Sequence, residues 1–218
     1  FASGALVFPG GKVDPDDSSE ETRECHAGVE TCDDVTLGLR ASAIREVFEE
    51  TGILLGRHRD SGQPVNGEAA AALDQSHRAG LLAEQKTMAD VAKTEDLVLS
   101  ADALAWFAHW ITPAARPIRF DTHFYLAQMP SGQAGAHDGD ESVDSVWILA
   151  RDAENEIRDK GFSAMFPTML NLEMLAESAT VSEALAATES RPVVPVIPVV
   201  QKDANGVKMV TIPANAGY

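Results

Sequence analysis

The segment "REVFEETGI" (45–53) constrains the fold most, because it sets three glutamates beside apolar side chains within a few residues. In a helix, side chains three and four positions apart are neighbours. Glu46, Glu49 and Glu50 would then lie within an arc of roughly 100°. Two like charges about 4 Å apart repel by roughly 4 kcal/mol at an effective dielectric near 20. The pattern therefore predicts a helix whose acidic face holds a cation.

The flanking sequence indicates where this helix begins and ends. Apolar spacing predicts a helix over 37–52, and Gly52 stands where a C-cap glycine belongs. A buried strand is predicted over 4–8, and the Pro-Gly-Gly breaker at 9–11 ends it. The polar, turn-rich stretch 14–34 is predicted to be a surface loop. The acidic helix thus follows a strand and a glycine turn.

The rest of the chain alternates strands and helices, which favours an α/β or α+β layered domain. A short strand is predicted at 53–55 and a loop at 56–67. Two helices are predicted within 68–93, separated near Gly80. The remaining predictions are strands at 104–112, 119–128 and 142–149, a flexible acidic loop at 130–141, and helices at 151–159, 167–178 and 181–188. The Pro- and Val-rich tail, 191–218, is predicted to be a hairpin or an extended arm at a sheet edge.

Charge and composition exclude several classes of function. The net charge of −17, from 34 acidic and 17 basic residues, repels phosphate backbones, so no nucleic-acid partner is expected. The sequence contains no run of eighteen apolar residues, so no membrane span is predicted. The first residues lack the basic segment with which a signal peptide begins. Cys25 and Cys32 flank His26 at a spacing that fits no zinc pattern, so we interpret them as free thiols. Together with a C-terminus that is not a peroxisomal signal, this makes the cytoplasm the expected compartment.

The cation can be chosen from the donor types. Glutamate oxygens, with a backbone carbonyl from the glycine turn, suit Mg²⁺ or Mn²⁺ better than zinc or copper. Such an ion keeps water ligands and leaves room for a phosphate oxygen. The implied chemistry is hydrolysis of a phosphate anhydride.

These residues resemble the Nudix box, G-x5-E-x7-R-E-U-x-E-E-x-G-U, where U is a bulky aliphatic residue. "REVFEETGI" matches its second half position by position, and "FPGGKVDPDD" is similar to its first half, with Gly11 and Asp17 at the glycine and first glutamate. Residues 18–44 number 27 where the pattern has seven. Such a split box looks like the coenzyme A and acyl-coenzyme A diphosphatase-like branch of Nudix hydrolases, as do "ALVFPGGKVD" and "WITPAARPIRFDTHFYLA".

The resemblance implies a fold and a domain organisation. The expected fold is a Nudix-type α/β/α sandwich with a mixed central sheet. The Nudix domain would cover 1–190, with an insertion at 18–38 inside the box and a helical insertion at 57–103. A C-terminal extension would cover 191–218.

Carried over residue by residue, the resemblance implies a metal site. Glu46 and Glu50 would be the primary ligands of Mg²⁺ or Mn²⁺, Glu49 a third or water-bridged ligand, and the Gly10 carbonyl a further one. Arg45 would orient a box carboxylate through a bidentate pair. Asp17 is one methylene shorter than the glutamate of the pattern, so it is open whether it forms the structural pairing expected at that position.

The general base remains open between two positions. It is either a box glutamate, Glu49 or Glu50, or a carboxylate on a later loop. Glu141 is the best loop candidate, with Asp140 and Asp144 as rivals, and a solvated acidic loop is the alternative interpretation.

Other polar and aromatic residues are interpreted mainly as structural. His109 and His123 are expected to be packed, hydrogen-bonded histidines. Arg119 is expected to pair with Asp121 rather than contact phosphate. Trp106 and Trp110 are expected in the core, although either could stack on an adenine.

The implied activity is divalent-metal-dependent hydrolysis of a pyrophosphate bond in a small nucleoside-diphosphate-linked substrate, with coenzyme A or acyl-coenzyme A favoured. ADP-ribose, NADH and dinucleoside polyphosphates are alternative substrates. A catalytically idle Nudix-fold module that binds a nucleotide is the alternative function. The tail could reach a neighbouring subunit, which would make a homodimer.

Overall fold

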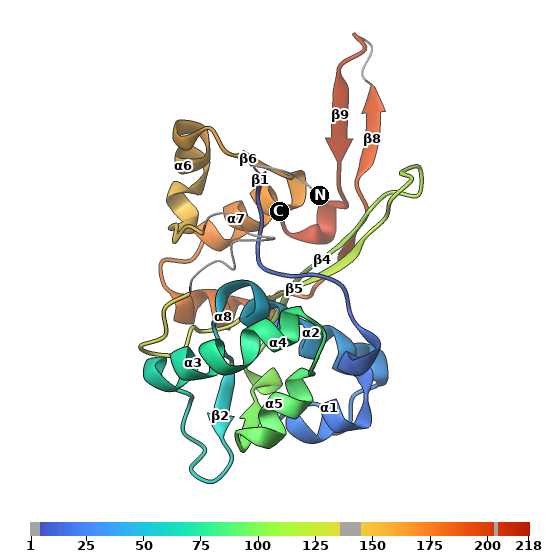
Figure 1. The fold of residues 1–218 in the computed structure, drawn as a ribbon. Coiled ribbons are helices and arrows are strands. Elements are labelled where there is room, and N and C mark those ends of the chain that lie inside the picture. The colour runs from blue at the N-terminus through green and yellow to red at the C-terminus, as the bar shows by residue number, and fades with distance from the viewer. Residues whose placement is uncertain (1–4, 136–144, 203–204) are drawn as a thin grey trace. The chain divides into compact units, whose positions relative to one another are not determined.

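The computed structural model describes residues 5–135, 145–202 and 205–218, which fall into two compact units (Figure 1). The box unit comprises the described residues of 9–104 and 127–147. The ribbon unit comprises those of 1–8, 105–126 and 148–218. Within the described residues, no helix is long and apolar enough to cross a membrane.

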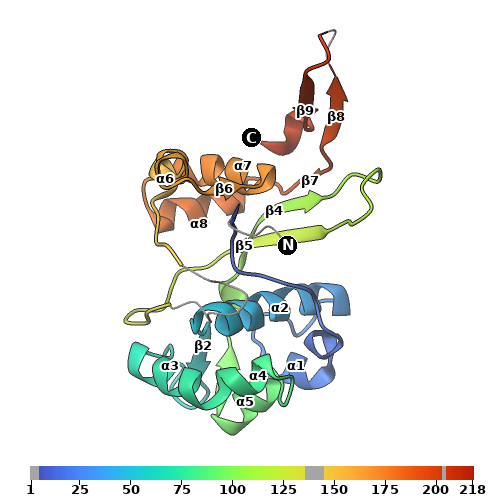
Figure 2. The same cartoon turned by 45° about the horizontal axis from the view of Figure 1, so that its top comes forward.

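The box unit is mainly helical. Figures 1 and 2 show its helices gathered around one short antiparallel strand pair, β2–β3. A π-helical turn at 74–78 joins α3 to α4. The elements are α1 (Glu20–Cys25), α2 (Asp34–Thr51), β2 (Gly56–His58), α3 (Gly67–Leu73), α4 (Ala79–Leu82), α5 (Met88–Thr94) and β3 (Leu97–Leu99).

Helix α2 is the predicted acidic helix, and its ends are closed by local hydrogen bonds. Asp33 is the N-cap, and its Oδ1 accepts a hydrogen bond from the backbone N–H of Thr36 at 2.7 Å. Gly52 takes the left-handed conformation, φ 70°, and its N–H donates to the Phe48 carbonyl at 2.8 Å. Ile44 and Phe48 are fully buried. The helix predicted over 37–52 is confirmed, and it begins three residues earlier.

The prediction of a surface loop at 14–34 is wrong. This stretch contains a 3₁₀ turn (Pro15–Ser18) and helix α1. Ser19 caps α1 by accepting a hydrogen bond from the Thr22 N–H at 3.1 Å, and Cys25 is only 1% exposed. Both cysteines are free, as predicted. The helix is too short to show an apolar period, so only its capping serine could have revealed it.

The predictions between 53 and 103 also need correction. The strand expected at 53–55 is absent, and β2 follows in the predicted loop instead. The helices are not separated at Gly80, since α4 runs through it and the break falls at 83–87. Strand β3 was not predicted. A short apolar run occurs both in strands and in buried irregular segments, so the pattern alone does not separate the two. The segment "ILL" is a buried irregular segment.

Gln133 explains how this buried segment satisfies its backbone. Its Oε1 accepts a hydrogen bond from the Leu54 N–H at 2.9 Å. Its Nε2 donates to the carbonyls of Leu54 at 3.0 Å and Val65 at 2.9 Å. One amide side chain thus replaces a neighbouring strand, and it is only 8% exposed.

Replacing Gln133 by alanine is expected to lower the free energy of unfolding by about 2–4 kcal/mol, because three buried backbone groups lose their partner. Chemical denaturation would measure the loss. Gln128→Ala is the matched control, because Gln128 is exposed in the same segment. Equal stability of the two variants would contradict the role of Gln133.

The ribbon unit is built on a long antiparallel pair, β4 (Ala105–Ile111) and β5 (Asp121–Leu126). Strand β7 (Pro195–Val196) pairs with β4 in parallel, so the sheet, in the order β5–β4–β7, is mixed. The edge position of Pro195 agrees with the prediction for the tail. The other elements are β1 (Ala5–Leu6), α6 (Ala153–Lys160), β6 (Ser163–Ala164), α7 (Phe166–Ala176), α8 (Val181–Ser190), β8 (Val199–Lys202) and β9 (Lys208–Thr211).

Most of the predicted elements of the ribbon unit are confirmed. The strands predicted at 104–112 and 119–128 and the last three helices are present, with ends shifted by a few residues. Strands β8 and β9 form the predicted hairpin. The strand predicted at 142–149 is not formed at 145–149, and its other residues lie outside the described ones.

Among the described residues, the ribbon unit contains two hydrophobic clusters that touch where Phe8 packs edge-on against Phe124. One is centred on Trp110, which is 4% exposed and whose indole N–H lies 3.1 Å from Asn171 Oδ1 and 2.9 Å from the Tyr218 hydroxyl. The other joins α6 and α7 to β1. The assignment of Trp110 to the core is confirmed, whereas Trp106 is 39% exposed.

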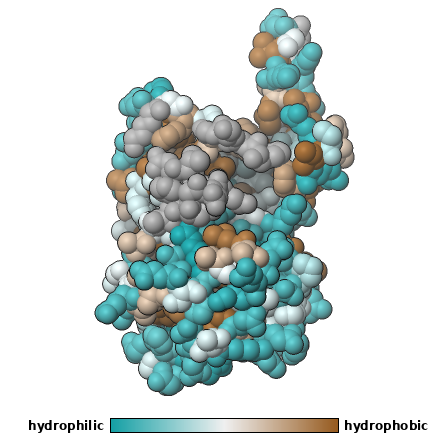
Figure 3. Space-filling model, viewed as in Figure 1, coloured by the Kyte–Doolittle hydropathy of each residue, from teal (hydrophilic) through white to brown (hydrophobic). Residues whose placement is uncertain are grey.

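The hairpin β8–β9 carries exposed apolar side chains. Val199, Val200, Met209 and Val210 are exposed there, each by more than 40%. Figure 3 shows brown, hydrophobic surface along the projecting hairpin. That the tail reaches a neighbouring subunit stays a prediction.

Candidate active site

The glycine turn at the start of the box unit faces the acidic helix. The Gly10 N–H lies 3.3 Å from Glu50 Oε1. Gly10 has φ 152°, a conformation that favours glycine. The turn and the helix are forty residues apart in sequence, and this hydrogen bond brings them together.

Arg45 lies at the centre of the site, and its side chain is 11% exposed. Its Nε and Nη2 bind the two carboxylate oxygens of Asp17 at 3.1 and 2.9 Å, a bidentate pair. Its Nη1 donates to Glu46 Oε1 at 3.0 Å and to Glu49 Oε2 at 2.9 Å. Nη2 also donates to the Lys12 carbonyl at 2.8 Å. One guanidinium therefore joins the upstream segment to the acidic helix.

Asp17 forms this pair despite its short side chain. It lies in the 3₁₀ turn after Asp14, and its Oδ2 accepts a hydrogen bond from the Asp14 N–H at 2.8 Å. The Asp17 side chain is 6% exposed. The turn brings the backbone close enough to Arg45 for a carboxylate one methylene shorter than glutamate. The pairing that the sequence left open is therefore present.

Burial perturbs the box glutamates Glu46 and Glu49. The side chains of Glu46 and Glu49 are 12% and 13% exposed. Desolvation raises the pKa of each, and the neighbouring Arg45 guanidinium opposes that rise. Asp14 and Asp17 add negative charge within 3.5 Å of the same guanidinium. A single arginine does not neutralise so many carboxylates, so an additional cation would be stabilised here.

The donor set also fits a hard cation. Glu46, Glu49, Glu50 and the Gly10 carbonyl are oxygen donors, the type that Mg²⁺ and Mn²⁺ prefer. Arg45 and Gly10 already hold the glutamate oxygens by hydrogen bonds. These residues would hold the ion once their oxygens turn toward a common point. The assignment of each residue as a ligand stays a prediction.

Gly11 leaves the space that Glu46 occupies. A Cβ atom added at Gly11 would lie 2.2 Å from Glu46 Oε1, closer than any stable contact. We expect Gly11→Ala to displace the Glu46 carboxylate and weaken Mn²⁺ binding at least tenfold, with little change in melting temperature, because only the end of a flexible side chain must move. Titration calorimetry and thermal unfolding would measure both. Gly56→Ala is the control for adding a methyl group, since its φ is not positive and the atoms nearest to the added Cβ would lie at 3.6 Å, an ordinary contact.

The raised pKa values predict how stability depends on pH. A carboxyl group whose pKa is higher in the folded protein than in the unfolded chain favours folding fully below the unfolded pKa, near 4.3. That contribution is lost as pH rises through the folded pKa. We therefore expect Glu46→Gln and Glu49→Gln to gain stability relative to the unsubstituted chain as pH rises through this window. Thermal unfolding without divalent ions, at several pH values, would show the difference. A constant difference would contradict the shift.

Arg78 supports the helix in a way that the sequence did not reveal. Its Nε donates to the Glu49 carbonyl at 2.6 Å, and its Nη1 contacts Asp74 Oδ1 at 3.3 Å. Asp74 and Arg78 lie at the two ends of the π-helical turn, four residues apart. In the sequence, only the spacing of an acidic and a basic residue four positions apart could have indicated this contact.

The loop candidates for the general base stay predictions, because Glu141, Asp140 and Asp144 lie outside the described residues.

Comparison with known proteins places the chain in a family. The family model described as the NUDT19 Nudix domain matches residues 26–175. The match includes the helix with Arg45 and the three glutamates. Gly11 and Asp17 precede it, and the structure brings Asp17 to the site through Arg45 and Gly11 to the site beside Glu46.

Individual relatives agree with the family model. A Caenorhabditis elegans protein provisionally named nudix hydrolase 7 is 28% identical over 179 residues, 81% of this chain and 52% of the relative. The acyl-coenzyme A diphosphatase NUDT19 of Xenopus laevis is 23% identical over 221 residues, 84% of this chain and 58% of the relative. The chain thus spans little more than half the length of these curated relatives.

A solved structure gives the fold. The crystal structure of a NUDIX hydrolase from Alicyclobacillus acidocaldarius superposes with a TM-score of 0.69 at 27% identity, over 84% of this chain and 81% of that one. The helices and the mixed sheet described above are consistent with the α/β sandwich predicted from the sequence. From the family model, the relatives and the fold together, the chain belongs to the Nudix hydrolase family, among the NUDT19-type Nudix domains.

Proposed function

We propose that the chain hydrolyses a pyrophosphate bond in a nucleoside-diphosphate-linked small molecule with the help of Mg²⁺ or Mn²⁺. The observation that supports this most directly is the Arg45 network. It joins Asp17 to Glu46 and Glu49, so both parts of a box split by a long insertion meet at one place.

Each residue then has a role that follows from its contacts. Glu46, Glu49 and Glu50 would hold the ion with the Gly10 carbonyl. When bound, the ion would neutralise the pyrophosphate and make a bound water more acidic. Arg45 keeps the Glu46 and Glu49 carboxylates in place, and Asp17 fixes Arg45. Glu49, Glu50 or Glu141 would accept the proton from the attacking water.

Coenzyme A or an acyl-coenzyme A is the favoured substrate. The support is the likeness to a relative named acyl-coenzyme A diphosphatase. Cleavage would add water across the anhydride and release 4′-phosphopantetheine, or its acyl form, and adenosine 3′,5′-bisphosphate. With a net charge of −17, the chain needs a local cation to accept such an anion. A reducing compartment such as the cytoplasm would suit the two free thiols.

A substrate panel tests this proposal. The purified chain would be incubated with coenzyme A, acetyl-coenzyme A, ADP-ribose, NADH and diadenosine tetraphosphate, with Mg²⁺, with Mn²⁺ and with EDTA. Chromatography would identify the two products. We expect metal-dependent cleavage with the highest kcat/KM for a coenzyme A species.

Two outcomes would overturn the proposal. Faster cleavage of ADP-ribose or NADH would replace the favoured substrate. Binding of a nucleotide by calorimetry, without turnover of any compound, would identify the idle nucleotide-binding module instead. The Glu50→Gln protein, purified in the same way, controls for a contaminating hydrolase.

A further inference from the structure

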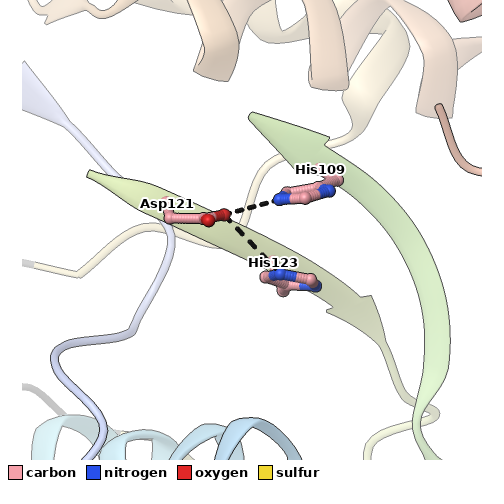
Figure 4. A group of neighbouring side chains, drawn as sticks. All are labelled: His109, Asp121 and His123. Atoms are coloured by element: carbon pink, nitrogen blue, oxygen red, sulfur yellow. Dashed lines mark hydrogen bonds and ion pairs between the residues drawn. The ribbon is translucent and has the colours of Figure 1, made fainter. Parts of the chain in front are cut away.

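Two histidines and an aspartate of the ribbon unit meet on one face of the β4–β5 pair (Figure 4). His109 is directly opposite His123 in the strand register, and Asp121 precedes His123 by two residues on the same strand. Residues two apart on a strand point to the same face. The antiparallel register therefore places all three side chains together.

The donor atoms are close enough to share one ion. Asp121 Oδ1 lies 2.5 Å from His109 Nε2 and 3.7 Å from His123 Nε2. One donor atom from each residue lies within 4.8 Å of the others, and no other group of three among the described residues meets this condition. Ligands about 2.1 Å from a tetrahedral ion are roughly 3.4 Å apart. Each donor would thus move by no more than about an ångström.

The two rings are held in place by packing. The His109 and His123 rings stack with centroids 4.0 Å apart, and Trp106 stacks on His123 at 5.4 Å with planes 16° apart. The two histidine side chains are 11% and 17% exposed, whereas Asp121 is 64% exposed. The imidazoles are therefore ordered before an ion binds, and an ion can reach them from solvent on the side of the exposed Asp121 carboxylate.

The Asp121 carboxylate points toward the two imidazoles. Arg119, which the sequence suggested as a partner of Asp121, donates its Nε to the Thr112 carbonyl at 3.1 Å. Asp121 faces the two histidines instead.

We propose that His109, His123 and Asp121 bind a divalent transition-metal ion, such as Zn²⁺ or Co²⁺, at a site separate from the Nudix box. Two imidazole nitrogens and one carboxylate favour transition metals, whereas the box offers only oxygen donors and suits Mg²⁺. Three protein ligands leave coordination positions for water. The bound ion would link β4 to β5 across the connection at 112–120.

One feature limits the affinity of this site. His109 Nδ1 is buried without a hydrogen-bond partner among the described residues, and its Nε2 faces Asp121. When Nε2 binds an ion, the proton of the imidazole ring lies on Nδ1, which has no acceptor. An unsatisfied buried N–H weakens binding by about 10- to 100-fold relative to a site with a supporting acceptor.

Cobalt titration tests the proposal. With the box saturated by millimolar Mg²⁺, the chain is titrated with Co²⁺, and the visible absorption of the ion and the tryptophan fluorescence are recorded. We expect one equivalent of Co²⁺ to produce a ligand-field band and to quench Trp106. A Trp106→Phe variant should keep the band and lose most of the quenching.

Variants distinguish this site from the box. Asp121→Asn is expected to lower the Co²⁺ affinity at least tenfold, and it should fold because Asp121 is mostly exposed. His123→Gln should do the same, whereas His58→Ala and Glu50→Gln should leave the affinity unchanged. Zn²⁺ should raise the melting temperature of the unsubstituted chain by a few degrees and that of Asp121→Asn by less.

The opposite pattern would overturn the inference. If Glu50→Gln removed the cobalt signal while Asp121→Asn and His123→Gln kept it, the ion would belong to the box. Absence of any band or calorimetric heat at millimolar Co²⁺ would show that the three residues form only a packed hydrogen-bonded cluster.

Discussion

An Arg45→Ala variant is expected to lose about 3–5 kcal/mol of unfolding free energy, the cost of removing one partner from a buried charge pair. Arg45 is 11% exposed, and the Asp17 side chain bound to it is 6% exposed. Without the guanidinium, Asp17, Glu46 and Glu49 would remain crowded and largely shielded from water. The carboxylates would also lose their fixed positions, so hydrolysis should fall with stability.

Chemical denaturation with and without Mg²⁺ would measure this loss. We expect Mg²⁺ to restore part of the stability of Arg45→Ala, because the ion replaces some of the missing positive charge. Arg45→Lys should recover less than half of the loss, since an ammonium group cannot form the bidentate pair with Asp17. Arg158→Ala is the matched control, because Arg158 forms an exposed pair with Asp159 that is worth less than about 1 kcal/mol. Similar losses at both arginines would contradict the central role of Arg45.

A Glu50→Gln variant is expected to lose activity and keep its fold. Glutamine retains an oxygen that can accept the Gly10 N–H, so the contact between turn and helix survives. It lacks the charge needed to hold a cation or to accept a proton. Loss of a general base or an equivalent charged group lowers kcat by about 10²- to 10⁴-fold. The melting temperature without metal should stay equal or rise, because one charge leaves the acidic cluster.

Steady-state kinetics at saturating Mg²⁺, together with thermal unfolding, would test this prediction. Glu189→Gln is the control, since Glu189 is an exposed glutamate near the end of α8. If Glu50→Gln collapsed the fold, Glu50 would be a structural residue. Full activity in this variant would remove it from the catalytic set and leave Glu49 or Glu141 as the base.

Where local signals were strong, the sequence predicted the elements well. Helix α2 has an apolar face and a glycine stop, and both are visible in the sequence. Strands β4 and β5 have the aromatic and β-branched residues that fit a pleated surface. These features depend on neighbouring residues, so no knowledge of the fold was needed.

Where long-range partners decide the structure, the predictions failed. Helix α1 is short, and it is stabilised by burying Cys25 in the box unit, which a polar sequence did not suggest. The segment 53–55 has the composition of a strand, but Leu54 bonds to a side chain, Gln133, from a distant loop. Tertiary contacts override local propensity at such places.

By itself, the sequence determined the acidic face of α2 and the oxygen chemistry of the site, because the spacing of Glu46, Glu49 and Glu50 fixes their positions on a helix. Only the tertiary structure decided which distant groups meet that face. The bidentate pair between Arg45 and Asp17 spans 28 residues, and a 3₁₀ turn hidden in an apparent loop makes it possible. In the ribbon unit, the pairing of His109 with His123 depends on strand register. Register follows from the packing and hydrogen bonding of whole strands, which no single residue encodes.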